Sequence, residues 1–186
     1  MEIDNFLQES SLDLPGVGQL GFIVHDIQTS LPSMSSLFNL RSWYQPQYTE
    51  KYFAIDDHPI ELDFNLAVSY LGKLQIELIE EKSHRARIYQ DHLDNYGEGL
   101  HHLGFFVHDI DAKLKQAEQI GLNILLESEF KTAGGGYVRF AYLDTRKLYG
   151  IICELANIKL YGINVPQTEL MMNVGRVTGD EMKINI

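Results

Sequence analysis

Nearly the same ten-residue phrase occurs twice in the sequence, as GQLGFIVHDI at residues 18–27 and as HHLGFFVHDI at residues 101–110. Each copy is an apolar, strand-like segment that ends close to an Asp, and residues with helical spacing follow it. Asp26 and Asp109 are well suited to cap these helices, because an Asp side chain accepts hydrogen bonds from the free amides of a first turn. The duplication therefore predicts two modules of similar fold.

Strand candidates follow each predicted helix, so that the order of elements in both halves is βαβββ. Gly121 is expected to end the second helix, whereas Pro32 is expected to weaken the first helix or to move its start to Ser30. The fold class is predicted as α+β. The strands are expected at residues 41–48, 62–71 and 73–80, and again at residues 123–130, 136–144 and 149–156.

The segment between the two halves, SHRARIYQDHLDNYGEG, is polar and has a few apolar residues at helical spacing, so it is expected to form a connecting helix before a glycine turn. The tail of the chain has mixed character, and its sequence does not decide between covering a sheet edge and reaching a partner chain. The predicted organisation is an N-terminal extension (1–17), a first module (18–83), a connecting helix (84–99), a second module (100–156) and a C-terminal tail (157–186).

Charge and hydropathy exclude several classes of partner. The formal net charge of the 186 residues is −11, and no basic run is present, which argues against nucleic acid or an anionic membrane as the main partner. The chain begins without the basic and apolar regions of a secretory signal, and no later stretch has membrane-spanning length. A cytoplasmic protein is therefore expected.

The two copies of the repeat differ most informatively at their second residue, which is Gln19 in the first copy and His102 in the second. Side chains alternate between the faces of a strand, so Gln19 shares a face with Gly21, and His102 shares one with Gly104. The glycines are expected to clear space beside the two polar side chains. If the strand is aligned one residue differently, His101 becomes the residue on this face instead.

A second matched pair lies near the end of each half, where Glu77 in QIELIE and Glu154 in IICELA interrupt apolar strands. An ionised carboxylate on a dry face costs several kcal/mol unless a cation or a strong hydrogen-bond donor compensates for it. Each polar residue taken alone has an ordinary structural explanation, such as a solvated edge position. The symmetry of the repeat favours instead a divalent metal site formed by Gln19, Glu77, His102 and Glu154.

These motifs resemble the vicinal oxygen chelate superfamily, which includes glyoxalases, bleomycin resistance proteins and dioxygenases, over roughly residues 18–156. The resemblance rests on QLGFIVHDI, LQIELIE, GLHHLGFFVHDIDAKLKQAEQIG and GGGYVRFAYLDTRKLYGIICELA, in the expected order. It implies two βαβββ modules whose curved sheets form a metal-binding cleft, with one ligand from the first and last strand of each module. It also implies one divalent ion per site (Zn, Ni, Co or Mn), no other cofactor, and a small-molecule carbonyl or thioester substrate.

Within the superfamily, the order Gln, Glu, His, Glu at the four ligand positions matches glyoxalase I, whereas methylmalonyl-CoA epimerase usually has His at the first position. Glutathione-dependent glyoxalases carry basic residues near positions where Ile23 and Glu98 stand here. The stretch PIELDFNLAVSYLGKLQIEL resembles the epimerase segment, in which Glu61 occupies the place of a catalytic carboxylate. The extradiol dioxygenases need two His and one carboxylate, which this set does not supply.

The resemblance thus implies a metal-dependent isomerase or lyase that abstracts a proton next to a carbonyl group, with Glu154 or Glu61 as the base. The alternative is a small-molecule binding or resistance protein of the same fold that has no turnover. A homodimer is expected, because paired βαβββ modules expose sheet edges and the tail has no clear place in either module.

Overall fold

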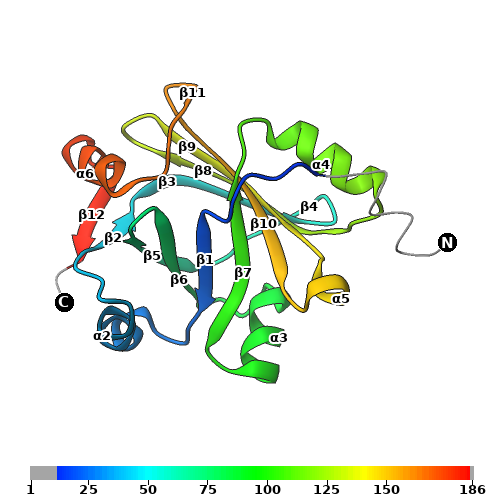
Figure 1. Ribbon diagram of the computed structural model, residues 1–186, viewed down its shortest axis with the longest axis horizontal. Coiled ribbons are helices and arrows are strands. Elements are labelled where there is room, and N and C mark those ends of the chain that lie inside the picture. Colours follow the sequence, from blue (N-terminus) through cyan, green and yellow to red (C-terminus); the bar gives the residue numbers. More distant parts are fainter. Residues whose placement is uncertain (1–11, 185–186) are drawn as a thin grey trace.

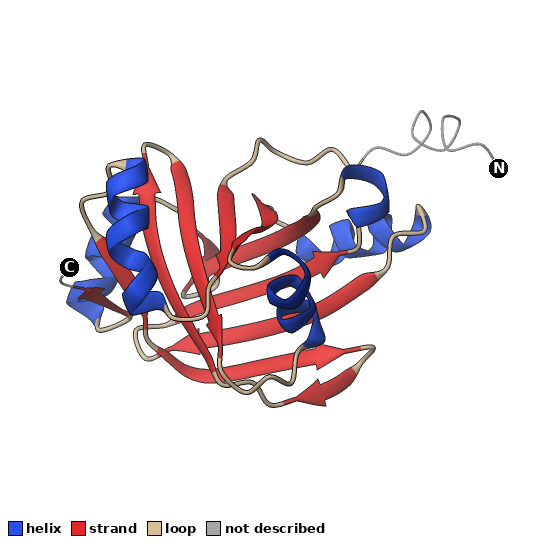
Figure 2. Ribbon diagram, turned by 90° about the horizontal axis from the view of Figure 1, so that it is seen from below, coloured by secondary structure: helices blue, strands red, loops and turns tan. Residues whose placement is uncertain are grey.

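A computed structural model describes residues 12–184, so residues 1–11 of the expected N-terminal extension and the last two residues lie outside the described part. The chain forms one strongly curled mixed sheet of twelve strands with helices packed against it (Figures 1 and 2). The predicted α+β class is confirmed. Along the sheet the strand order is β12-β2-β5-β6-β1-β7-β10-β9-β8-β3-β4, and β11 pairs with β10.

The first repeat begins with β1 (Gln19–Ile23) and α2 (Ile27–Phe38). Asp26 caps α2 as predicted, because its side chain accepts a hydrogen bond from the amide of Thr29 at 2.8 Å. The alternative start at Ser30 is wrong, since the helix begins at Ile27 and continues through Pro32. Pro32 cannot donate the backbone hydrogen bond that another residue would make at this position. The Asp26 cap and the burial of Ile27 and Leu31 compensate for this loss. The module continues with β2 (Trp43–Pro46), β5 (Phe64–Leu71) and β6 (Leu74–Glu81).

The second repeat has the same plan. Asp109 caps α4 by accepting a hydrogen bond from the amide of Ala112 at 3.0 Å. The C-cap residue is Ile120, and the predicted cap residue Gly121 follows it with a φ of 79°. A positive φ of this kind is where glycine carries no steric penalty. The helix between the two modules is α3 (Arg87–Tyr96). The second module consists of β7 (Gly99–Phe106), α4 (Ile110–Gln119), β8 (Ile124–Thr132), β9 (Gly136–Leu143), the short helix α5 (Arg146–Tyr149) and β10 (Ile152–Leu160).

A hairpin that the sequence analysis did not predict joins the two modules. It consists of β3 (Tyr48–Ile55) and β4 (His58–Ile60), and β3 pairs with β8 of the second module instead of with its own module. Its turn contains Asp56 and Asp57, both with positive φ, as in the tight turns of hairpins. The burial of β3 is concentrated in Phe53 and Ala54, so the alternating pattern of a half-buried strand is weak.

The C-terminal tail forms β11 (Ile163–Asn164), α6 (Glu169–Thr178) and β12 (Glu181–Ile184). Strand β12 pairs antiparallel with β2, so this tail covers the outer edge of the first module's part of the sheet. Of the two roles that the sequence left open, the structure thus shows the covering of a sheet edge.

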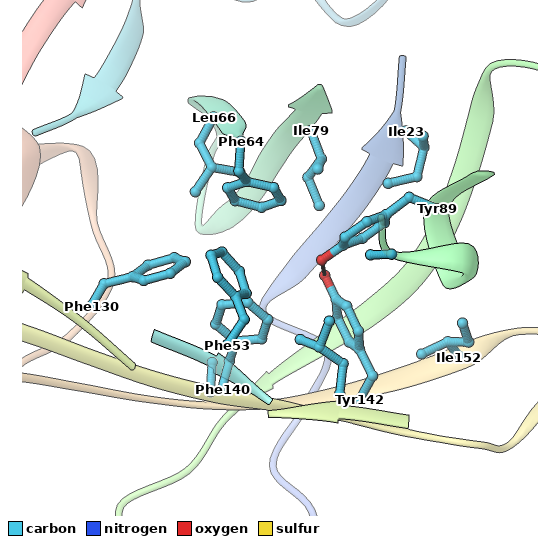
Figure 3. Packing of buried hydrophobic residues seen from close by; sticks show 13 residues of the cluster. Ile23, Phe53, Phe64, Leu66, Ile79, Tyr89, Phe130, Phe140, Tyr142 and Ile152 are labelled. Atoms are coloured by element: carbon cyan, nitrogen blue, oxygen red, sulfur yellow. Dashed lines mark hydrogen bonds between the residues drawn. The ribbon is translucent and has the colours of Figure 1, made fainter. Parts of the chain in front are cut away.

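Alternation along the strands separates two apolar layers. On the outer face, α2 packs over Ile76 and Leu78, and α4 packs over Ala141 and Leu155. Inside the curl lies an aromatic cluster in which Phe53, Phe130 and Tyr142 are almost fully buried (Figure 3). This inner face is the one that carries the site described below. None of the helices in residues 12–184 is long and apolar enough to cross a membrane.

Candidate metal centre and its cavity

Strand register at the centre of the sheet brings the four predicted ligand positions together. Strand β1 runs parallel to β6 and antiparallel to β7, and β7 runs parallel to β10. In this register Gly21 lies between Glu77 and His102, while Gly104 lies between Gln19 and Glu154. The two repeats thus contribute equivalent pairs of side chains, one from the first and one from the last strand of each module.

The two glycines are necessary for this arrangement. A Cβ atom at Gly21 would overlap the imidazole ring of His102, and one at Gly104 would lie 2.5 Å from Gln19 Oε1 and 3.2 Å from Glu154 Oε2. The prediction that these glycines clear space for the polar side chains is confirmed. Any larger residue at either position would displace a member of the site.

The four side chains converge on the imidazole of His102, which is fully buried. Its Nε2 atom lies 3.3 Å from Gln19 Oε1, 3.1 Å from Glu154 Oε2 and 3.6 Å from Glu77 Oε2. The donor atoms of Glu77, His102 and Glu154 all lie within 4.8 Å of one another, as a common metal ion would require. Gln19 adds a neutral oxygen to this set, and we call the four residues the tetrad.

The electrostatics of the tetrad fit a divalent cation. Burial, and then the nearby charge of Glu154, raise the pKa of Glu77 well above its usual range. The Oε2 atom of Glu154 is buried and has no hydrogen-bond partner among residues 12–184. Two buried carboxylates beside one imidazole are short of positive charge, and a metal ion with a 2+ charge would compensate for both. Carboxylate and amide oxygens with one imidazole nitrogen suit hard to borderline metals.

Gln75 is part of the site although the sequence analysis did not select it. Its Oε1 atom accepts a hydrogen bond from Gln19 Nε2 at 2.7 Å, and its own Nε2 donates to the hydroxyl of Tyr70 at 2.7 Å. This chain of hydrogen bonds holds the Gln19 amide with its oxygen toward His102. The available signal was its spacing, because Gln75 stands two residues before Glu77 and therefore on the same strand face.

His101 lies behind His102 instead of in the tetrad. The Nδ1 atoms of the two rings are 3.1 Å apart, so His102 can donate a proton to His101 and keep the lone pair of Nε2 free for a metal. Burial, and then the neighbouring His102 and His92, lower the pKa of His101 well below its usual value. A neutral ring is the form that can accept this hydrogen bond.

Glu61 is not brought to the tetrad. Its side chain is 96 % exposed, and its nearest charged partner is Arg85, at 3.7 Å. It is not among the residues that line the cavity next to the tetrad. Of the two carboxylates expected as candidate bases, Glu154 therefore lies in the tetrad and Glu61 lies away from it.

The tetrad opens into a cavity. Gln19, Glu77 and Glu154 contribute polar atoms to its lining, and His102 lies beneath them. The remaining lining is mostly apolar and comes from both modules and from the C-terminal tail. It includes Tyr48, Phe64, Leu66, Val68, Phe106, Phe130, Val138, Phe140, Tyr142, Ile158, Met171 and Met172.

Solved structures with this fold include several epimerases. Methylmalonyl-CoA epimerase from Mycobacterium tuberculosis has a TM-score of 0.53 at 18% identity and covers 85% of this chain and 92% of its own. A Streptomyces coelicolor methylmalonyl-CoA epimerase variant in complex with 2-nitronate-propionyl-CoA has a TM-score of 0.56 at 19% identity, with coverage of 83% and 100%. A hypothetical protein from Bacillus halodurans has a TM-score of 0.51 at 19% identity, with coverage of 75% and 91%. At these identities the likeness is one of fold alone.

No curated protein matches the chain significantly. The family described as Glyoxalase/Bleomycin resistance protein/Dioxygenase superfamily matches residues 18–142, which span both copies of the repeat and three of the four tetrad residues. The chain belongs to the glyoxalase/bleomycin resistance protein/dioxygenase superfamily, the vicinal oxygen chelate superfamily that its sequence motifs resemble.

Proposed function

We propose that this protein is a metal-dependent isomerase or lyase that removes a proton from the carbon atom next to a carbonyl group. The observation that carries the proposal is the convergence of two buried carboxylates, one amide oxygen and one imidazole at the floor of an apolar cavity. Gln19, Glu77, His102 and Glu154 would hold one divalent ion. Bound there, the ion would supply Lewis-acid stabilisation of the negative charge that develops on the substrate oxygen.

The residues of the chain divide the remaining work. Gln75 and His101 hold Gln19 and His102 in the orientation that the site requires. Glu154 is the proposed base, because its buried Oε2 atom has no hydrogen-bond partner among residues 12–184 and borders the cavity. The apolar walls exclude water, which keeps the carboxylate weakly solvated and so a stronger proton acceptor.

Glu61 remains the competing proposal for the base because of its place in the epimerase-like segment. For Glu61 to act, the segment after β4 would have to move its side chain from the surface into the cavity. Glu154 needs no such movement, and we therefore assign the base to Glu154.

Proton exchange tests the proposal. Purified protein loaded with Zn, Ni, Co or Mn is incubated in deuterated water with small α-acidic carbonyl compounds and thioesters, and the loss of the α-proton signal is followed by NMR. Metal-stimulated exchange is expected for at least one substrate. Glu154→Gln should slow this exchange roughly a hundredfold to ten-thousandfold, the usual contribution of a positioned base. Glu61→Gln should exchange at the wild-type rate, and the reverse result would move the base to Glu61.

The alternative is a binding protein that sequesters a small molecule without turnover. Both carboxylates of the tetrad lie within 3.6 Å of the His102 imidazole, where each would act as a metal ligand. This favours the alternative, because neither carboxylate is then left as a separate base. This alternative predicts metal-dependent ligand binding with no exchange of α-protons for any compound that binds. The same NMR samples decide between the two.

A further inference from the structure

The C-terminal tail forms one wall of the cavity, and its contribution lies beyond the segment matched by the superfamily. From α6, Met171 faces the cavity and Met172 also packs against Tyr44 and Val68. From the start of β12, the side chain of Glu181 reaches the same space.

This wall is tied to both modules. Tyr44 of the first module donates a hydrogen bond from its hydroxyl to Glu169 Oε1 at 3.2 Å, and β12 pairs with β2. In the second module the amide of Gly134 donates to Asp180 Oδ1 at 2.6 Å. With anchors on both sides, α6 and β12 form a fixed part of the cavity.

The cavity lining offers little positive charge to an anionic ligand. Among the described lining residues, Lys159 is the only Lys or Arg, whereas Glu77, Glu154, Asp180 and Glu181 all contribute carboxyl groups. Phosphates and carboxylates of carrier groups are usually bound by several Arg and Lys side chains. This lining cannot supply such a set.

Glu181 gives the wall a polar group that is not matched within the protein. Its Oε2 atom is buried without a hydrogen-bond partner in residues 12–184, and a Cβ at Gly175 of α6 would come within 2.6 Å of its Cγ. Burial, and then the neighbouring Asp180, raise the pKa of Glu181 to about 8. At neutral pH the carboxyl group is mostly protonated, so it can donate a hydrogen bond to an oxygen atom of a ligand.

We propose that α6 and the start of β12 form the specificity wall of the site, and that the site accepts a compact, largely apolar and uncharged compound with two adjacent oxygen atoms. The oxygens would face the tetrad, the apolar body would lie against the aromatic lining and Met171, and Glu181 would contact a further oxygen. A coenzyme A thioester or a glutathione conjugate does not suit this lining. The inference rests on the proposed function for the role of the adjacent oxygens, but the apolar wall can be tested without metal.

The first experiment uses metal-free protein and the neutral apolar fluorophore N-phenyl-1-naphthylamine. Wild-type protein should bind the dye with increased fluorescence. Met171→Lys places a charge in the wall and should weaken binding by about tenfold or more, because burying an unpaired ammonium group is unfavourable. Leu170→Lys is the matched control, since Leu170 is the preceding residue of α6 and is 71% exposed. Its dye affinity should equal that of wild type, and circular dichroism should show both variants folded.

The second experiment uses Zn²⁺-loaded protein and calorimetry with two chelators that share a pair of adjacent oxygens. Benzohydroxamate should bind about tenfold more tightly than acetohydroxamate, because it buries a ring against the apolar wall. Met171→Lys should abolish this preference, whereas the exposed control Leu170→Lys should keep it. Propionyl-CoA and S-hexylglutathione should bind more weakly than benzohydroxamate.

Three results would each overturn the specificity wall: equal affinity for the two hydroxamates, tighter binding of propionyl-CoA than of benzohydroxamate, or equal effects of Met171→Lys and Leu170→Lys on the dye. Failure of the proposed function looks different. In that case the NMR samples would show no exchange of α-protons, and a failed metal site would in addition bind neither zinc nor the hydroxamates. The dye would still bind and would still respond to Met171→Lys but not to Leu170→Lys.

Discussion

At the scale of single residues, the tetrad concentrates negative charge in a place that water scarcely reaches. Glu77 and Glu154 are 8% and 5% exposed, and within residues 12–184 His102 is the only histidine whose Nε2 atom lies close to both carboxylates. A proton on Glu77 relieves part of this repulsion, as its raised pKa indicates. A divalent ion would relieve it more completely, and binding would displace that proton.

We expect purified protein to bind one divalent ion per tetrad, as measured by elemental analysis after dialysis. His102→Ala and Glu154→Gln should each weaken metal binding by about tenfold or more, because each removes a proposed ligand of the metal. Loss of a residue that only hydrogen-bonds to a metal ligand already weakens metal binding by roughly tenfold or more. His108→Ala is the control, since His108 is exposed and lies outside the tetrad. Equal metal content in all four proteins would contradict the assignment of the ligands.

At the scale of elements, the site depends on which strands are neighbours. The parallel pairs β1–β6 and β7–β10 bring the first and last strand of each module together, and the antiparallel pair β1–β7 joins the modules at their glycines. The tail adds an element that the repeat does not contain. Because β12 continues the sheet beyond β2, it carries Glu181 into the cavity at the cost of burying a carboxyl group.

That burial predicts a pH dependence of stability. The pKa of Glu181 is raised to about 8 in the folded state, above its ordinary value of 4.5. The folded protein therefore binds more protons than the unfolded chain between these values, and the stability due to this group falls as the pH rises from about 4.5 through about 8. Relative to Glu181→Gln, the wild type should lose free energy of unfolding over this window.

Urea unfolding of both proteins at pH 5 and pH 9 measures the difference. Asp144→Asn is the control, because hydrogen bonding to Arg146 lowers the pKa of Asp144 below its ordinary value of 3.8, so the contribution of Asp144 to stability does not change between pH 5 and pH 9. A wild-type minus Glu181→Gln difference that is constant from pH 5 to pH 9 would show that Glu181 is not buried as the structure places it.

At the scale of the whole molecule, the curled sheet does not close on itself and ends at β12 on one side and at β4 on the other. The outer surface of the tail also exposes large apolar side chains, with Leu170 71%, Val177 89% and Met182 51% exposed. Open strand edges and neighbouring apolar side chains are the features through which chains associate.

We therefore expect a homodimer. Sedimentation equilibrium at micromolar concentration should give a mass of about twice that of one chain, and Val177→Glu should shift the equilibrium toward monomer if the exposed face of α6 takes part. Sedimentation of the wild type as a monomer throughout this range would contradict the prediction. Metal content measured on the same samples shows whether the tetrad needs the dimer.

The repeat and its glycines were sufficient to predict much of this protein. Strand alternation has a period of two residues, so the face shared by Gln19 and Gly21, and by His102 and Gly104, follows from local geometry alone. The same holds for Asp26 and Asp109, whose capping bonds reach only three residues along the chain. The carboxylates in otherwise apolar strands were recognisable because a buried charge needs compensation.

Only the tertiary structure decided which further residues reach the tetrad and its cavity. Gln75 became a partner of Gln19, Glu61 stayed at the surface, and Glu181 entered the cavity from the far end of the chain. The pairing of β3 with β8 of the second module and the pairing of β12 with β2 could likewise not be predicted from the local sequence pattern of these strands. The physical reason is that these contacts join strands far apart in sequence, and the register and curl of the whole sheet determine them rather than the preferences of any single segment.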